Sequence, residues 1–327
     1  MTVMVIGGQG FIGSHLCVAM AEQGEDVVCY DSASRIPPLL TAAPEEVNRR
    51  IRIVRGSVLD VARLISVAKE RGVEGIIQPA AVLPPTSEEL PMEALKVNVL
   101  GVANVCEAAR ILDLRRFVCF SSQGVYGARA SLEPLAEDEP VDPTAGMYQA
   151  SKYMGEITGC QYALQYGVPF IAIRTSMVFG PGQSFLYPLN VIVGHALKRI
   201  PLKWIDGGDH PLDYTYVKDV CHGAILAYKA VSPRHRVYNI AGSRLVTNFD
   251  ILRLVKQHIA DAPIEMGPGL LSNPPLYRKI LTGPLSVNRA REDLAFEHRY
   301  GFEGGLGEYI EHLQRTPEEL EAMVRSL

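Results

Sequence analysis

The chain has 327 residues, of which 47% are hydrophobic and 21% are charged. This composition is typical of a globular protein, and it excludes a disordered chain, a collagen and a disulfide-rich miniprotein. The formal net charge is −4 and no long run of one sign occurs, so nucleic acid is not expected as a partner. The length fits one large domain with a smaller companion.

The cysteines and the hydropathy pattern indicate the cellular compartment in which the protein is expected. Six cysteines are scattered without a C-x-x-C pair, and we expect them to be reduced, buried thiols. No apolar run approaches the roughly 18 residues that span a bilayer, and the first residues lack the basic and apolar regions of a signal peptide. We therefore expect a cytoplasmic protein without a membrane partner.

Short apolar runs alternate with segments of helical period in the first half of the chain. Such alternation indicates a parallel sheet that is covered on both faces and binds its ligands beyond the carboxyl ends of the strands. The expected strands are residues 3–6, 26–30, 51–55, 75–78, 116–120 and 169–174. The expected helices between them are residues 14–23, 60–71, 92–112 and 145–166.

After Arg174 this alternation loosens, and Gly and Pro become frequent. We expect residues 1–175 to form the first domain and residues 176–327 a smaller mixed α/β lobe that binds substrate, with an interleaved boundary. The lobe should contain helices at 217–230 and after Thr247, whose side chain and Asp250 form an imperfect capping box. A strand near 236–241 is expected to return to the sheet of the first domain.

Gly7, Gly10 and Gly13 stand between the first expected strand and the first expected helix. Without side chains there, a pyrophosphate can approach the backbone and accept hydrogen bonds from the helix N-terminal amides near Phe11 and Ile12. This pattern predicts a Rossmann-type, doubly wound parallel sheet. Tight turns and close helix packing produce the same glycine pattern, so the context has to decide.

Asp31 supplies that context, since it stands at the end of the second expected strand, about 20 residues further on. A carboxylate there can accept hydrogen bonds from both ribose hydroxyls of adenosine and repel a 2′-phosphate, which favours NAD over NADP. The alternative is that Asp31 only begins a turn. Arg35 also lies close in sequence, and its guanidinium could accommodate a phosphate.

Tyr148 and Lys152 are four residues apart on an expected helix and therefore share one face. A tyrosine ordinarily ionises near pH 10, but a neighbouring ammonium and a positive nicotinamide ring both favour the phenolate. Tyr148 could then exchange a proton with a substrate near neutral pH. The same spacing also occurs by chance on helix surfaces.

Several motifs occur in one order along the chain. They are the glycine triplet, Asp31, Ala80-Ala81, Val97-Asn98-Val99-x-Gly101, Ser121-Ser122-x-x-Val125-Tyr126-Gly127, Tyr148-x-x-x-Lys152 and Arg174. In this order the chain resembles the extended short-chain dehydrogenase/reductases, the NAD-dependent epimerase/dehydratase family. The resemblance extends from residue 1 to about 243 and implies NAD as the cofactor.

This resemblance implies specific roles for three residues. Ser122 would donate a hydrogen bond to the reacting substrate oxygen, Tyr148 would act as acid and base, and Lys152 would hold the nicotinamide ribose and lower the pKa of Tyr148. The residues expected near the cofactor are Gly7, Gly10, Phe11, Ile12, Gly13, Asp31, Ser57, Val58, Ala80, Ala81, Asn98, Tyr148 and Lys152. The family usually has an Asp where Ser57 stands, and Asn98 is expected to fix the adjoining loop.

Departures from the family pattern bear on the substrate. Gln123 and Gly124 stand where 4,6-dehydratases of the family carry acidic residues, which argues against water elimination. Met177 and Leu212 replace an amide and a basic side chain that usually face the diphosphate of a UDP-sugar, with a loss of about 1.5–3 kcal/mol for each charge-assisted hydrogen bond. Arg278 is a possible substitute.

The remaining interpretation is an NAD-dependent dehydrogenase for a secondary alcohol of a sugar, sugar acid or polyol-like substrate. Its candidate substrate-binding residues are Val82, Gln123, Met177, Leu212 and Arg278. The alternatives are a nucleotide-sugar epimerase of the UDP-sugar type with tightly bound NAD and, third, an NAD-sensing protein without catalysis. The histidine spacings match no zinc motif, so no metal is expected.

Broad apolar faces on the helices at 92–112 and 145–166 favour a homodimer. In the related family the matching pair forms a four-helix interface. An ordinary stripe of residues that faces the core would have the same pattern.

Overall fold

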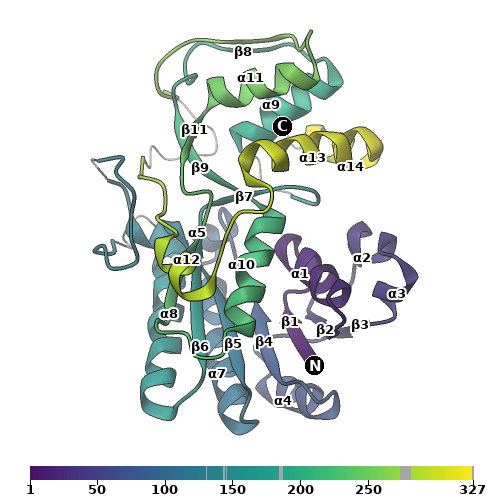
Figure 1. Ribbon diagram of the computed structural model, residues 1–327, viewed down its shortest axis with the longest axis vertical. Coiled ribbons are helices and arrows are strands. Elements are labelled where there is room, and N and C mark those ends of the chain that lie inside the picture. Colours follow the sequence, from purple (N-terminus) through teal and green to yellow (C-terminus); the bar gives the residue numbers. More distant parts are fainter. Residues whose placement is uncertain (130, 143, 145, 184–186, 273–280, 326–327) are drawn as a thin grey trace.

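The computed structural model describes residues 1–129, 131–142, 144, 146–183, 187–272 and 281–325. Its centre is a seven-stranded parallel sheet with the order β10-β6-β5-β4-β1-β2-β3 (Figure 1). The strands are β1 (Thr2–Ile6), β2 (Asp26–Asp31), β3 (Ile51–Arg55), β4 (Gly75–Gln78), β5 (Arg116–Ser122), β6 (Phe170–Thr175) and β10 (Val237–Ile240). This order reverses at β1, which confirms the doubly wound sheet that the sequence predicts.

Helices cover both faces of this sheet because most of its strands are apolar on both sides, whereas the edge strand β3 exposes Arg52, Ile53 and Arg55. In β1, Val3 and Val5 belong to one core cluster, whereas Met4 and Ile6 belong to the other. The first cluster contains α1 (Phe11–Glu22) and α10 (Val217–Lys229), and the second contains α4 (Val61–Glu70), α7 (Gly101–Ile111) and part of α8 (Met147–Tyr166). Such two-sided burial is the usual environment of parallel strands.

The connections after the strands carry short helices. They are α2 (Pro38–Ala42), α3 (Glu45–Asn48), α5 (Thr86–Glu89), α6 (Pro91–Leu95), the π-helix η1 (Lys96–Leu100) and the 3-10 helix η2 (Gln123–Tyr126). The helix expected at 92–112 is therefore continuous through α6, η1 and α7, but one π-helical turn interrupts its α-helical geometry. Such turns are rare and often occur at functional sites.

The second half of the chain builds a smaller group of elements above the carboxyl ends of the strands (Figure 1). It contains the three-stranded sheet β11-β9-β7 and the two-stranded sheet β12-β8. Its elements are β7 (Met177–Phe179), α9 (Pro188–Lys198), β8 (Leu202–Trp204), β9 (Pro211–Tyr216), β11 (Leu245–Thr247), α11 (Asn248–His258), β12 (Ile264–Met266), α13 (Gly301–Arg315) and α14 (Pro317–Arg325).

The two groups of elements are interleaved. Strand β10 pairs in parallel with β6, so the chain returns to the large sheet after building part of the upper group. Helix α12 (Asn288–Leu294) packs on α10 and β10. At α11 both bonds of the capping box form, since Thr247 Oγ1 accepts from the Asp250 amide and Asp250 Oδ2 accepts from the Thr247 amide, each at 3.1 Å. The exact domain boundary stays a prediction.

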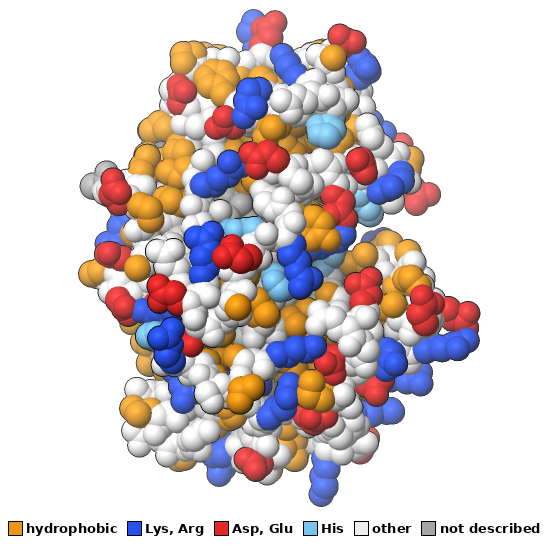
Figure 2. All heavy atoms as spheres, viewed as in Figure 1, with side chains coloured by type: hydrophobic (Ala, Val, Ile, Leu, Met, Phe, Trp, Pro, Cys, Tyr) orange, Lys and Arg blue, Asp and Glu red, His pale blue; other side chains and the backbone are white. Residues whose placement is uncertain are grey.

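The distribution of surface charge and the state of the cysteines match what the sequence predicts. On the face in Figure 2 basic and acidic side chains are interspersed, without a large field of one sign. All six cysteines are free thiols, and all but the half-buried Cys160 are buried. Among the described residues no helix has the length and apolar character that crossing a bilayer requires.

Candidate active site

The glycine turn lies between β1 and α1, and its three glycines have different reasons to lack a side chain. A Cβ at Gly7, which has a φ of 85°, would lie 2.8 Å from backbone atoms of Ala80, and one at Gly13 would lie 1.9 Å from the Gly7 oxygen. Close packing therefore explains these two. At Gly10 a Cβ would meet only the Gly7 oxygen, at 3.2 Å, so the space beside Gly10 is open to a ligand.

Helix α1 begins beside this open space. Gly10 is its N-cap, no side chain caps the terminus, and the first turn has no acidic residue. The first amides of a helix have no acceptor within the helix, and together with the helix dipole they form a binding place for an anion. Phe11 and Ile12 provide amides of this kind, so the turn and α1 fit the diphosphate of a dinucleotide.

Asp31 is the last residue of β2, and its carboxylate is held on both sides. Oδ2 accepts from the Gln9 amide at 2.9 Å, and Oδ1 accepts from the Ala33 amide at 2.9 Å. Asp31 thus begins a turn and is also tied to the glycine turn. Each carboxylate oxygen keeps a further lone pair, so this half-buried group can still accept ribose hydroxyls.

Ser57 and Val58 follow β3, and local hydrogen bonds fix them. Ser57 Oγ accepts from the Leu59 amide at 3.2 Å, and Tyr30 donates its phenol hydrogen to the Ser57 carbonyl at 3.2 Å. Asn104 Nδ2 donates to the Val58 carbonyl at 2.9 Å. The Ser57 side chain supports its own turn, and its contact with adenine stays a prediction.

Asn98 lies in the π-helical turn η1 and is buried. Its Oδ1 accepts from the Val82 amide at 2.8 Å, and its Nδ2 donates to the Val82 carbonyl at 3.0 Å and to Ser151 Oγ at 2.9 Å. Asn98 therefore links the loop after Ala80 and Ala81 to the helix that carries Tyr148 and Lys152. The expected fixing of this loop has a direct structural basis in these bonds.

Ser122 at the carboxyl end of β5 meets Tyr148 of α8, and Lys152 lies one turn further along the same helix. A side-chain hydrogen bond joins Ser122 to Tyr148, and Ser122 Oγ also accepts from the Gly124 amide at 3.1 Å. Lys152 is buried one turn along α8, and burial lowers its pKa.

The electrostatics of Tyr148 differ from the sequence expectation. Burial raises the pKa of Tyr148 to about 12, and the hydrogen bond with Ser122 opposes this only in part. Lys152 is not among the groups that shift this pKa. The protein groups alone therefore keep the phenol protonated near neutral pH, and the expectation that Lys152 lowers its pKa is not met by them.

Two carboxamide side chains flank these three residues. Gln123 follows Ser122 and is buried, and Gln149 follows Tyr148 and is half-buried. The Oε1 atom of each is buried and has no hydrogen-bond partner among the described residues. An unpaired buried acceptor is costly, so each of these oxygens can take one further hydrogen bond.

Sequence reasoning missed Glu88 on α5, whose carboxylate lies at the N-terminus of α8. Its Oε2 accepts from the Met147 amide at 3.0 Å, and its Oε1 accepts from the Tyr148 amide at 3.1 Å. The carboxylate caps α8 and complements its dipole. A capping residue 60 positions away in sequence leaves no local signal.

The other expected substrate residues lie in the upper group of elements. Met177 begins β7 and is half-buried, whereas Leu212 in β9 is only 5% exposed and packs in the apolar core. Arg278 lies outside the described residues. The contacts of these three residues with substrate stay predictions.

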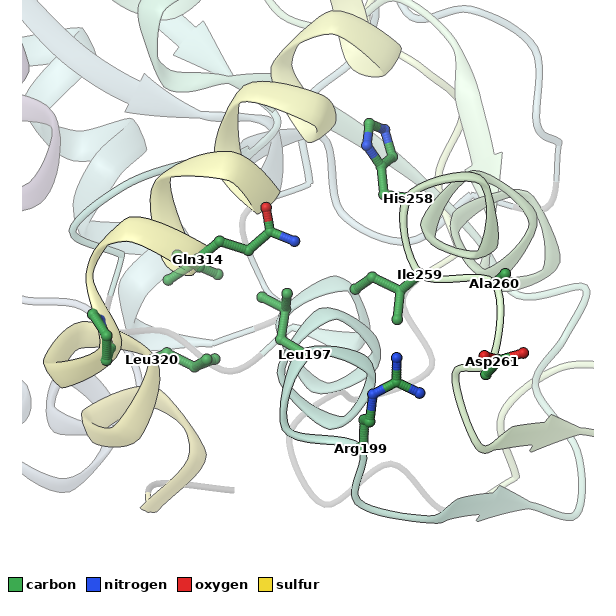
Figure 3. A pocket seen from close by; sticks show the side chains of 10 residues that line it. Leu197, Arg199, His258, Ile259, Ala260, Asp261, Gln314 and Leu320 are labelled. Atoms are coloured by element: carbon green, nitrogen blue, oxygen red, sulfur yellow. The ribbon is translucent and has the colours of Figure 1, made fainter.

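Metal ligands and a second pocket bear on other ligands of the protein. Among the described residues no group of three or more His, Cys, Asp or Glu side chains could hold a metal ion. A pocket of about 500 Å³ lies between the ends of α9, α11 and α13 and the start of α14, with Arg199, His258 and Gln314 on its walls (Figure 3). It is separate from the residues described above.

The sheet order and the glycine turn define a protein of the Rossmann type whose first turn fits a dinucleotide. The sequence model of the NAD dependent epimerase/dehydratase family matches residues 3–241. The chain belongs to this family, and NAD is its cofactor.

Known relatives share most of the chain. A UDP-glucose 4-epimerase of Lacticaseibacillus casei is 28% identical over 92% of each chain, and that of Neisseria gonorrhoeae is 30% identical over 77% of this chain and 81% of its own. The solved UDP-glucose 4-epimerase of Thermotoga maritima with UDP-glucose has a TM-score of 0.83, with 25% identity over 97% of this chain and all of that chain. A dTDP-glucose 4,6-dehydratase of Bacillus anthracis with NAD has a TM-score of 0.83 at 23% identity over 99% of each chain, which shows the fold.

Proposed function

We propose that this protein is an NAD-dependent dehydrogenase that acts on a secondary alcohol of a sugar, sugar acid or polyol-like substrate. The observation that carries the proposal is the hydrogen-bonded pair of Ser122 and Tyr148, with Lys152 one helical turn further, at the same sheet edge as the glycine turn. NAD, when bound, accepts the hydride from the carbinol carbon. The protein residues hold the substrate oxygen and move its proton.

Each of the three residues has a distinct role in this proposal. Ser122 donates a hydrogen bond to the substrate oxygen and keeps it beside Tyr148. Tyr148 Oη takes the hydroxyl proton in the oxidation direction and returns it in the reduction direction. Lys152 holds ribose hydroxyls, and its positive charge favours the phenolate once substrate and cofactor are assembled.

Side chains near this centre support a small hydroxylated substrate. The unpaired Oε1 atoms of Gln123 and Gln149 are acceptors for substrate hydroxyls. Met177 and Leu212 offer no charge to a diphosphate, and both stand in the part of the lobe where the resemblance places such contacts. Val82 lies in the loop fixed by Asn98, and we assign it to the wall of the substrate site.

A nucleotide-sugar epimerase is the second candidate, because UDP-glucose 4-epimerases recur among the relatives and a solved structure with UDP-glucose has a TM-score of 0.83. Turnover separates the two. The purified protein is incubated with NAD and a panel of free polyols, sugar acids and UDP-sugars, while NADH absorbance and sugar isomers are measured separately. Net NADH from a free polyol or sugar acid supports the dehydrogenase, whereas isomerised UDP-sugar without net NADH replaces it by the epimerase.

The Tyr148→Phe protein tests the proposed acid and base. Phenylalanine keeps the ring but removes the transferable proton, so we expect a loss of turnover of about 10²–10⁴-fold with an unchanged NAD dissociation constant. Tyr153→Phe, on the same helix, is the matched control and should keep full turnover. Equal turnover in the Tyr148→Phe and parent proteins contradicts the role given to Tyr148.

We also propose that the protein is a homodimer in the cytoplasm. The free cysteines suit a reducing compartment. Large apolar side chains are exposed along α6, η1, α7 and α8, where the sequence predicts the dimer contact. They are Met92, Leu100, Ile111, Met154, Ile157, Leu164 and Tyr166.

A further inference from the structure

The segment Gly180–Gln183 follows β7 and lies beside the N-terminal half of α1. The His15 ring nitrogen Nε2 hydrogen-bonds with the Pro181 carbonyl oxygen at 2.8 Å, and both residues are buried. A Cβ at Gly182 would lie 3.9 Å from Phe11 Cδ2. The segment is therefore in van der Waals range of the first turn of α1, where the cofactor diphosphate is proposed to bind.

The same segment is held from the other side by the C-terminal helices. The Gly182 amide donates to Glu319 Oε1 at 2.6 Å. Glu319 lies on α14, and its Oε2 pairs with His312 Nε2 of α13 at 2.7 Å. Gly182 and Glu319, which are 137 positions apart in sequence, thus meet beside the first turn of α1.

A second bond network fixes the end of the segment. Asn190 Nδ2 donates to Gln183 Oε1 at 3.2 Å and to the Tyr309 phenol oxygen at 3.0 Å. The chain continues to Tyr187, whose pKa is raised by burial and by the nearby Tyr148. Tyr187, four residues after Gln183 in the sequence, is therefore close to the proposed catalytic tyrosine.

The Glu319 carboxylate is well suited to hold a backbone amide. Burial opposes its ionisation, but the hydrogen bonds from His312 and Gly182 outweigh this and keep the pKa of Glu319 below its usual value. Charge-assisted hydrogen bonds of this kind are stronger than those between neutral groups. Gly182 is exposed, has a φ of 83° and carries no side chain that could pack against the protein. Its position therefore depends on hydrogen bonds of its backbone.

We propose that Glu319 is a positioning residue that holds the segment Gly180–Gln183 over the first turn of α1 and thereby tightens NAD binding. Glu319 acts through the Gly182 amide and does not itself contact the cofactor. This inference rests on the proposed place of the diphosphate at Phe11 and Ile12. It assigns the C-terminal helix, which lies beyond the residues matched by the family model, to cofactor binding.

The test compares NAD dissociation constants, measured by calorimetric titration of the full-length proteins freed of nucleotide. Glu319→Ala removes both acceptors, and we expect about tenfold weaker binding. Glu319→Gln keeps an amide oxygen for the Gly182 amide, so we expect binding within about threefold of the parent. Glu318→Ala, on an exposed neighbour in α14, should leave binding unchanged.

Two further measurements separate positioning from a purely structural role. Thermal unfolding without NAD reports whether each variant is folded, and hydrogen exchange at residues 180–183 should be faster in Glu319→Ala than in Glu319→Gln. An unchanged dissociation constant in folded Glu319→Ala protein, or an equal loss in Glu318→Ala, overturns the proposal. Normal NAD binding by Asp31→Ala would instead reject the proposed cofactor site, since that change removes the ribose acceptor without touching Glu319.

Discussion

At Tyr148 two physical effects act in opposite directions. Burial raises the pKa of the phenol to about 12, whereas its chemistry requires the phenolate in the oxidation direction. Lys152 is also buried, and burial lowers its pKa. Burial thus disfavours the charged form of both side chains, the phenolate of Tyr148 and the ammonium of Lys152. The assembled site has to supply the remaining stabilisation of the phenolate, which couples proton transfer to cofactor binding.

Asp213 in β9 is a buried carboxyl group for which the proposed chemistry has no role. Burial raises the pKa of Asp213 to about 7, although its Oδ2 accepts from the Leu285 amide at 2.9 Å. Between about pH 4 and 7 the folded state therefore binds a proton that the unfolded state has released. The free energy of unfolding should fall as pH rises through this window.

The Asp213→Asn protein tests this linkage by denaturant unfolding between pH 4.5 and 8. Asparagine keeps an acceptor for the Leu285 amide and cannot ionise, so this variant should gain stability relative to the parent as pH rises, by at most about 1.4 kcal/mol per pH unit. Asp261→Asn, on an exposed residue, should run parallel to the parent. A constant difference between Asp213→Asn and the parent across this range shows that the carboxyl group is not protonated in the folded state.

Candidate site residues that belong to a sequence motif could be predicted from the sequence. Those whose hydrogen-bond partner lies far away in the sequence could not. Tyr148 and Lys152 stand at a spacing that places both on one helix face, and Ser122 was assigned its role through the family resemblance. Glu88 and Glu319 act through backbone amides 60 and 137 positions away, so nothing in their local sequence indicates the partner. The Tyr148 pKa was also beyond sequence reasoning, because it depends on how deeply the fold buries the ring.

At the scale of elements, α8 connects the proposed catalytic residues to the sheet through a buried charge pair. Arg174 of β6 donates to Glu156 of α8 through Nε at 3.2 Å and also through Nη2. Its Nη1 donates to the Tyr126 phenol oxygen at 2.8 Å and to the Glu137 carbonyl at 3.2 Å. One guanidinium thus joins a strand, the catalytic helix, η2 and the loop after it.

Glu156→Ala should destabilise the protein strongly, because it leaves the Arg174 charge buried with only neutral partners at short range. We expect a loss of about 3–5 kcal/mol in the free energy of unfolding, measured with a chemical denaturant. Glu93→Ala removes the exposed pair with Lys96 and should cost less than about 0.5 kcal/mol, since water screens that pair. Equal losses of unfolding free energy in the two variants would show that the buried pair contributes no more to stability than the exposed pair.

The elements of the large sheet follow the sequence within one to three residues at most ends, because most of its strands are short apolar runs between turn residues. The upper group was harder to predict. Strands β7, β8, β11 and β12 have three residues each, too few for a periodic pattern. They pair with segments far along the chain, so tertiary contacts and not local sequence decide their conformation.

At the scale of the whole molecule, the unpaired apolar side chains of α8 form a stripe on one helix face. Met154, Ile157 and Leu164 are three and seven residues apart, and their exposed fractions are 45%, 43% and 73%. Single exposed apolar residues are ordinary, but a contiguous row on a long helix indicates a protein contact. Leu100 and Ile111 add exposed apolar surface on the neighbouring helices.

The double variant Ile157→Glu with Leu164→Glu tests the proposed homodimer. Two carboxylates from each protomer would lie in the contact, where burying unpaired charges is costly, so we expect the variant to sediment as a monomer and the parent as a dimer. The control is Ile205→Glu, at a side chain that is 90% exposed in the upper group of elements, and it should stay dimeric. A parent protein that sediments as a monomer at micromolar concentration, or a double variant that remains a dimer, rules out a dimer built on this face of α8.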